Sequence, residues 1–314
     1  MSYDLYFGTK NGRERPSREE LAEYFDGRAC YRVEGDQATY DNRDTGVYFH
    51  FDLADSPEPE ILAELGEDAF RHFASFNLNY SRPLIFGLEA APELAAFIAR
   101  FDLATNDPQV DGRGRKPFSE EGFLAGWNDG NIDAYQNFAK DFSGEEFHAL
   151  PAEILEAVWR WNRDRGAHQE RLGQNVFVPK ISMVTTREGS QPKTMVVWPD
   201  ALPCVLPRVE MIFIPRQQLA PRRLFLRHED LAVTNWADAA PLILGFRQVP
   251  GPLPYWKLDY ESPPKEVAAF VAGLEPVRKD DFQMLGNDQV LTLELLQAAC
   301  GEEATANRDR TSAP

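Results

Sequence analysis

Alternation of apolar and polar residues organises the first hundred residues of the chain. Residues 47–53 alternate strictly, with valine and phenylalanines on one side and tyrosine, histidine and aspartate on the other. This is the period of a strand that buries one face. The same reasoning predicts strands at residues 3–7, 30–33, 37–40 and 70–80, with a turn at 41–46.

Two segments of this region carry helical spacing instead. Ser17 is followed by Glu20 and then by apolar residues, which is the signature of a capped helix start. Residues 92–101 repeat apolar side chains at helical spacing, and Pro92 suits a first helical position. The resulting order predicts an antiparallel sheet with helices packed on one face.

The remainder alternates between helical and extended patterns. Residues 119–173 are predicted to be helical, with a turn or interruption at 127–131, where the sequence reads Trp-Asn-Asp-Gly-Asn. Strands are predicted at 176–185, 194–198, 209–214 and 242–249, a helix after Pro263-Pro264, and a last helical region at 282–300.

These elements predict an α+β fold with the following organisation: an N-terminal α+β lobe at 1–110, a helical middle at 111–175, a strand-rich α+β lobe at 176–300 and a frayed tail at 301–314. Residues 89–99 resemble residues 261–272, and both segments place a proline at an expected helix start. The hypothesis is a pair of related lobes, and the alternative is the common use of proline to begin helices.

Charge adds an asymmetry to this picture. The 314 residues carry 33 Lys+Arg against 50 Asp+Glu, a formal net charge of −17. Residues 1–175 hold 33 acidic and 18 basic residues, a net of −15, which leaves −2 for residues 176–314. Such acidity disfavours binding to nucleic acid or to a membrane surface and favours a basic protein partner. Arginines of the second half, such as Arg216, are expected at the surface as partners of these acids.

The sequence contains no assembled catalytic signature. HExxH, Walker A and GxSxG motifs are absent, and Cys30, Cys204 and Cys300 lie far apart. We therefore expect no metal, no cofactor and no enzymatic activity. Reduced thiols, the lack of a signal-peptide pattern at the N-terminus and the lack of a long apolar run lead us to expect a cytoplasmic protein that does not enter a membrane.

The acidic residues in and after the 41–46 turn are the candidate partner-binding surface. The predicted set is Tyr40, Asp41, Asp44, Asp52 and Asp55. Carboxylates placed together can imitate the phosphates of a nucleic acid, and a tyrosine can anchor an interface. The alternatives are an ordinary solvated face for the acids and a core position for the tyrosine.

Four short segments also carry a resemblance to a family. They are Ser2-Tyr3-Asp4-Leu5-Tyr6-Phe7, Asp44-Thr45-Gly46-Val47-Tyr48-Phe49, Asn79-Tyr80-Ser81-Arg82-Pro83 and Asp107-Pro108-Gln109. Over residues 1–110 the chain resembles uncharacterised bacterial proteins associated with immunity proteins that are encoded beside polymorphic or secreted toxins. The resemblance implies a cytoplasmic protein that blocks a cognate toxin, often a nuclease, and it implies no catalytic residues.

The leading hypothesis is therefore an immunity protein that occludes the active site of a basic toxin, plausibly a nuclease. An enzyme whose site assembles only in the fold is the first alternative, and a scaffold protein with a constitutive partner is the second. A pocket with converging histidine, cysteine or carboxylate side chains would favour the enzyme. The sequence leaves the oligomeric state open.

Overall fold

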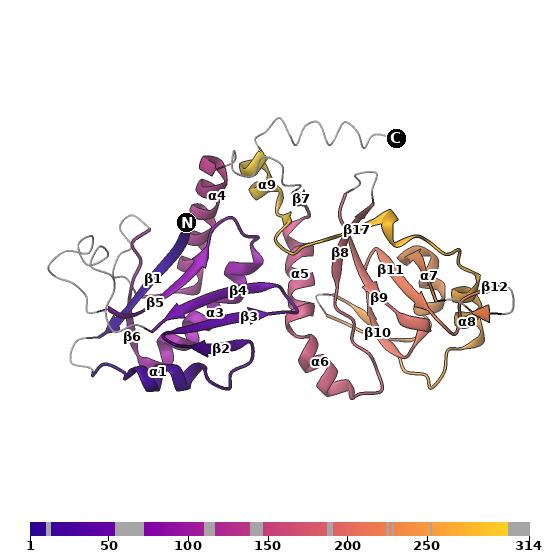
Figure 1. Ribbon diagram of the computed structural model, residues 1–314, viewed down its shortest axis with the longest axis horizontal. Helices are drawn as coiled ribbons and strands as arrows, with labels where there is room; N and C mark the ends of the chain where they lie inside the picture. Colours follow the sequence, from indigo (N-terminus) through magenta and orange to yellow (C-terminus); the bar gives the residue numbers. More distant parts are fainter. Residues whose placement is uncertain are drawn as a thin grey trace. The chain divides into compact units, whose positions relative to one another are not determined.

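The computed structural model describes residues 1–10, 14–53, 72–109, 117–138, 147–186, 191–223, 226–227, 229–251 and 253–300. The chain forms two compact units (Figure 1). Unit 1 comprises Met1–Phe147 and Leu291–Pro314, and unit 2 comprises His148–Val290. The predicted α+β class with antiparallel sheets is confirmed.

Unit 1 is built on a six-stranded sheet. Its strands are β1 (Ser2–Thr9), β2 (Tyr31–Glu34), β3 (Gln37–Asn42), β4 (Val47–Asp52), β5 (His72–Asn79) and β6 (Leu103–Asn106). They lie in the order β2-β3-β4-β5-β1-β6, and every neighbouring pair is antiparallel. The strand period read from the sequence therefore corresponds to a sheet with one buried face.

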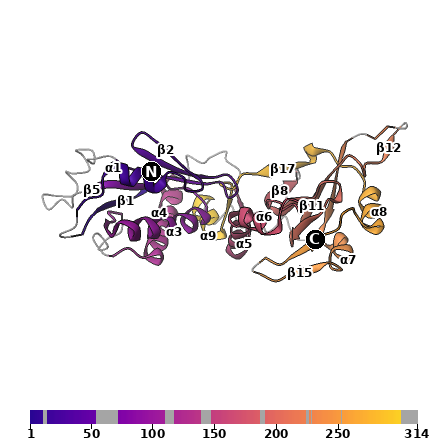
Figure 2. The ribbon, with the colours of Figure 1, turned by 90° about the horizontal axis from the view of Figure 1, so that it is seen from below.

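The described residues of unit 1 form the helices α1 (Arg18–Phe25), α3 (Ile85–Phe101), α4 (Glu120–Phe138) and α9 (Leu293–Cys300). The predicted cap of α1 is confirmed, because Ser17 Oγ accepts from the Glu20 amide at 3.1 Å and the Glu20 carboxylate accepts from the Ser17 amide at 2.8 Å. Figure 2 shows α3 and α4 on one side of the strands β1, β2 and β5.

Aromatic rings fill the space between this sheet and its helices. Phe51 of β4 lies 4.9 Å from Phe25 of α1 and 5.0 Å from Phe97 of α3, measured between ring centroids. All three side chains are almost fully buried. Aromatic pairs at this spacing add to the free energy gained from burial alone, so this cluster ties α1 and α3 to the centre of the sheet.

The sequence-based turn at residues 127–131 is wrong, since these residues lie inside α4. Trp127 is fully buried. Gly130 lies against the Tyr80 ring, and a Cβ added there would come within 2.4 Å of the Tyr80 hydroxyl oxygen. Asn131 is also fully buried and binds the backbone of the segment that leads into α3. The glycine and asparagine thus serve helix packing, although in isolation they indicate a turn.

The two similar proline segments occupy different positions. Helix α3 begins at Ile85, so Pro92 lies in its interior, whereas Pro264 is the N-cap residue of α8 (Lys265–Gly273). The sheets of the two units also differ in strand order and strand direction. The structure therefore gives no support to the hypothesis of two related lobes.

The described residues of unit 2 form two sheets and two short strand pairs. The strands are β7 (His148–Ala149), β8 (Ser182–Thr186), β9 (Lys193–Val197), β10 (Cys204–Pro207), β11 (Met211–Arg216), β12 (Arg222–Arg223), β13 (Leu226–Arg227), β14 (Asp230–Asn235), β15 (Arg247–Val249), β16 (Tyr255–Leu258), β17 (Phe282–Leu285) and β18 (Val290–Leu291), the last at the boundary with unit 1. The larger sheet has the order β14-β11-β9-β8-β17, with β9 and β11 parallel, and the smaller has the order β10-β16-β15.

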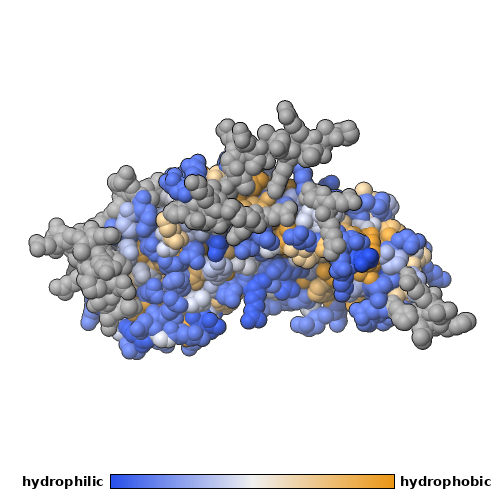
Figure 3. Space-filling view, turned by 45° about the horizontal axis from the view of Figure 1, so that its top comes forward, coloured by the Kyte–Doolittle hydropathy of each residue, from blue (hydrophilic) through white to orange (hydrophobic). Residues whose placement is uncertain are grey.

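The helices of unit 2 are α5 (Ala152–Arg163), α6 (Arg165–Leu172), α7 (Trp236–Ile243) and α8. Val158 and Trp161 of α5 join one hydrophobic core with residues of both sheets. Apolar residues also occupy the second face of the larger sheet, around Val184, Met195 and Phe213. Figure 3 shows hydrophobic side chains gathered on unit 2, whereas the described surface of unit 1 visible there is mainly hydrophilic.

The boundaries differ from those predicted. The expected helical middle at 111–175 does not stand apart, because α4 belongs to unit 1 while α5 and α6 belong to unit 2. The strand expected at 242–249 is the end of α7 followed by the short β15, and the helical region expected at 282–300 contains β17 and β18 before α9. Residues 301–314 lie outside the described part of the chain.

Candidate functional site

One face of the unit 1 sheet carries polar side chains across five strands, and we call it the outer face. It consists of Ser2, Asp4, Tyr6, Arg32, Glu34, Gln37, Thr39, Asp41, Tyr48, His50, Asp52, Ser75, Asn77 and Asn79, all exposed or half-buried. The residues between them in the sequence are mostly buried against the helices. The alternation thus separates an apolar, helix-covered face from a polar one.

Strand register places these side chains in rows. One row crosses five strands through Arg32, Thr39, His50, Asn77 and Asp4. A second also crosses five strands, through Glu34, Gln37, Asp52, Ser75 and Tyr6. Opposed residues on antiparallel strands have neighbouring Cβ atoms, so each row is a continuous strip of polar groups.

Hydrogen bonds fix several carboxylates of the outer face. Gln37 Nε2 donates to Asp52 Oδ1 at 3.1 Å, and Asn77 Nδ2 donates to Asp4 Oδ1 at 2.7 Å. The imidazole of His50, whose Nε2 lies 3.6 Å from Asp52 Oδ2, and the hydrogen bond from Gln37 lower the pKa of Asp52 below its usual value. The carboxylate of Asp52 is therefore ionised and oriented at neutral pH.

The structure separates the predicted partner-binding residues. Asp41 is exposed on β3 and Asp52 is half-buried on β4, and both lie on the outer face. Asp44 lies in the turn that joins these strands, where its backbone N–H donates to Asn42 Oδ1 at 3.0 Å. Asp55 lies outside the described residues.

Tyr40 is not a surface anchor. Its side chain is only 6% exposed, its ring stacks on Phe49 at 4.5 Å, and its hydroxyl donates to the buried Glu89 at 2.7 Å. An exposed tyrosine of the outer face is instead Tyr48, 39% exposed, whose hydroxyl accepts from Arg82 Nε at 2.8 Å and Nη2 at 2.6 Å. The alternation of residues 47–53 already placed Tyr48 on the same side as Asp52.

Buried phenols make unit 1 sensitive to alkaline conditions. Burial, followed by the Glu89 carboxylate, raises the pKa of Tyr40, and burial raises the pKa of Tyr80 to about 12. Tyrosines of the unfolded chain ionise at about pH 10. Below that pH, the contribution of these protonated tyrosines to the stability of unit 1 is fully present. We expect it to fall as pH rises through about 10 to 12, because only the unfolded state then releases these protons readily.

Thermal unfolding between pH 8 and pH 12, followed with absorbance at 295 nm, measures this effect. Tyr40→Phe should reduce the alkaline loss, and Tyr48→Phe, which removes an exposed phenol, is the matched control. A midpoint that does not change with pH up to 12 would contradict the prediction.

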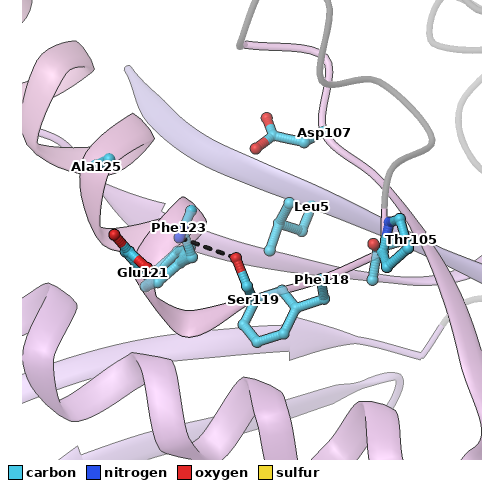
Figure 4. A pocket seen from close by; sticks show the side chains of 10 residues that line it. Leu5, Thr105, Asp107, Phe118, Ser119, Glu121, Phe123 and Ala125 are labelled. Carbon is cyan, nitrogen blue, oxygen red and sulfur yellow. Dashed lines mark hydrogen bonds between the residues drawn. The ribbon is translucent and has the colours of Figure 1, made fainter.

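A pocket of about 350 Å³ lies between the β6 edge of the unit 1 sheet and the start of α4 (Figure 4). Its walls are formed by Leu5, Thr105, Asp107, Pro117, Phe118, Ser119, Glu121, Gly122, Phe123 and Ala125. Sequence reasoning did not identify this pocket, because its walls come from three segments that only the fold brings together.

The described residues give little support for a catalytic thiol or for a metal-binding site. Burial raises the pKa of the Cys204 thiol, and burial together with Glu89 raises that of Cys30. A thiol with a raised pKa is protonated at neutral pH and is a poor nucleophile. Within the part of the chain that the structure describes, no group of three or more His, Cys, Asp or Glu residues is placed to hold a metal ion.

In comparisons with known proteins, no family model, no curated protein and no solved structure matches this chain. None of the described helices has the length and apolar character needed to cross a membrane.

Proposed function

We propose that the protein is a cytoplasmic immunity protein that binds and neutralises a basic toxin through the outer face of unit 1. The observation that supports this proposal is the outer face itself, a polar sheet surface whose described strands carry the carboxylates of Asp4, Glu34, Asp41 and Asp52 and one arginine, Arg32. The partner is a protein with a basic cleft, and a nuclease toxin is the class that this charge favours.

The outer face suits recognition of a protein partner because the carboxylates that would accept its hydrogen bonds are already ordered. Hydrogen bonds across strands hold Asp4 and Asp52 before any partner arrives, so little side-chain entropy is lost on binding. Tyr48 adds an amphipathic ring within the same surface, held by Arg82. In this mechanism the carboxylates take the place of substrate phosphates, and the sheet blocks the active-site cleft of the toxin.

Charge reversal on the outer face tests this function. In stopped-flow association with the product of the neighbouring gene, Asp41→Lys with Asp52→Lys should lower the association rate constant about tenfold at low salt. The reason is that complementary charge acts mainly on diffusional encounter. The difference from the native protein should shrink at physiological ionic strength, where exposed charges are screened over about 8 Å.

The matched control is Glu23→Lys with Glu120→Lys, which changes the net charge equally at exposed helical positions of unit 1. It should slow association much less than the outer-face pair. An equal loss in both variants would reject the outer face as the binding surface. A neighbouring product that neither binds nor loses its activity at equimolar protein would reject the immunity function.

A further inference from the structure

The pocket beside β6 has an apolar floor. Leu5 and Phe123 are almost completely buried, and Phe118 is half-buried with its ring 6.2 Å from that of Phe123. Leu5 points to the helix-covered side of the sheet, whereas its neighbours Asp4 and Tyr6 belong to the outer face. The pocket is therefore a different site from the surface proposed above to bind a toxin.

Carboxylates stand on the rim of this floor. Figure 4 shows Asp107 across the pocket from Ser119 and Phe118, with Glu121 and Thr105 on the remaining sides. Asp107 is held in place, because one carboxylate oxygen accepts from the Tyr3 hydroxyl and the other accepts from the Gln109 backbone N–H at 3.2 Å. A carboxylate fixed in this way needs no further ordering when a ligand binds.

Tyr3 contacts both the apolar floor and the carboxylate rim of the pocket. The Tyr3 ring whose hydroxyl binds Asp107 packs edge-on against Phe123, with centroids 5.3 Å apart. Described acidic residues also surround the neighbouring Tyr80: after burial, the causes that raise its pKa to about 12 are the charges of Asp107, Asp4 and Asp133. A ligand here meets apolar rings and negative charge within one small volume.

We propose that this pocket binds an alkylguanidinium or alkylammonium ion. The alkyl stem lies on Leu5 and Phe123, and the cationic head donates hydrogen bonds to the carboxylates of Asp107 and Glu121. The face of the Phe118 ring adds a cation–π contact. Ligand pockets typically measure about 300–1,000 Å³, so a pocket of about 350 Å³ suits a ligand the size of one arginine or lysine side chain.

Titration of the full-length protein with n-butylguanidinium, followed by NMR shifts of amides 119–125, tests the proposal. Saturable binding is expected, and the neutral isostere n-butylurea should bind at least about tenfold more weakly, because charge-assisted hydrogen bonds to carboxylates are stronger than neutral ones. Asp107→Asn with Glu121→Gln should weaken binding of the cation by at least about tenfold for the same reason.

The matched control, Glu23→Gln with Glu120→Gln, removes the same net charge, including one acidic residue beside Glu121 in the first turn of α4. It should leave the affinity within about twofold, because neither residue lines the pocket. Should the Asp107 variant fail to fold, Phe118→Ala takes its place, and a several-fold weaker affinity is then expected from the lost ring contact.

Capped Gly-Arg-Gly and Gly-citrulline-Gly peptides distinguish two sources of the ion. Binding of the arginine peptide but not the citrulline peptide assigns the pocket to a side chain of a protein partner. Binding of n-butylguanidinium without the arginine peptide assigns it to a free organic cation. Equal affinity for n-butylurea, no saturation, or equal losses in the test and control variants would overturn the proposal. None of these readouts depends on the toxin-binding function.

Discussion

Replacing Arg216 by leucine should lower the free energy of unfolding of unit 2 by about 3–5 kcal/mol. The side chain of Arg216 is completely buried, and its guanidinium makes a two-point contact with Asp230, through Nε at 2.8 Å and Nη2 at 3.0 Å. Its Nη1 also donates to the carbonyl oxygens of Val271 at 2.7 Å and Leu274 at 2.9 Å, where α8 ends.

Leucine would leave a carboxylate and two helix-end carbonyls without their donor in the interior. This loss is costly because the buried carbonyls would be unpaired and the Asp230 carboxylate, whose side chain is only 22% exposed, would lose its neutralising partner. Lysine keeps the positive charge but lacks the planar guanidinium group with its several N–H donors. Arg216→Lys should therefore recover only part of the lost free energy of unfolding. Equilibrium unfolding in urea, monitored by tryptophan fluorescence, measures both variants.

Arg208→Leu is the control for this experiment, because Arg208 is an exposed arginine of the same unit. It should change the free energy of unfolding by less than about 0.5 kcal/mol. Similar losses at both positions would show that the buried network of Arg216 does not stabilise unit 2 in particular.

Replacing Asn131 by alanine should destabilise unit 1 by about 3 kcal/mol. Asn131 Oδ1 accepts from the backbone N–H of Ser81 at 2.6 Å and of Arg82 at 3.3 Å, and its Nδ2 donates to the Arg82 carbonyl oxygen at 2.6 Å. These bonds join α4 to the bend that connects β5 with α3. Their loss would leave buried backbone groups unpaired.

Asn128→Ala is the matched control, since it makes the same change in helix propensity one turn earlier on α4, at a half-buried position. Alanine is the better helix former, so this variant should be neutral or slightly more stable. Denaturant unfolding of both variants measures the difference. Equal stability of the two variants would disprove the role assigned to the Asn131 side chain.

The sequence was informative at several features of unit 1 that depend only on neighbouring residues. Strict alternation located β4 and assigned its two faces, because a strand side chain points to the side opposite that of its neighbour. The capping box of α1 was predictable for the same reason, since Ser17 and Glu20 bond within a single turn. The outer-face positions of Asp41 and Asp52 follow from the same local rules.

Three features depended on residues far apart in the sequence. Tyr40 can be a core residue because Glu89, on a helix 49 positions later in the sequence, accepts a hydrogen bond from its hydroxyl. Arg216 is buried because Asp230 and the end of α8 converge on it. The pocket exists only where residues 5, 105–107 and 117–125 meet.

By itself, the sequence determined the α+β class, the period of each early strand, the start of α1 and the acidic character of the first half, because each depends on spacing or composition along the chain. Only the tertiary structure decided which polar residues are buried, where the two units divide and which segments form the pocket. The physical reason is that a buried polar group is stable only with a specific partner. In this protein that partner often comes from a distant segment, as Asn131 does for Ser81.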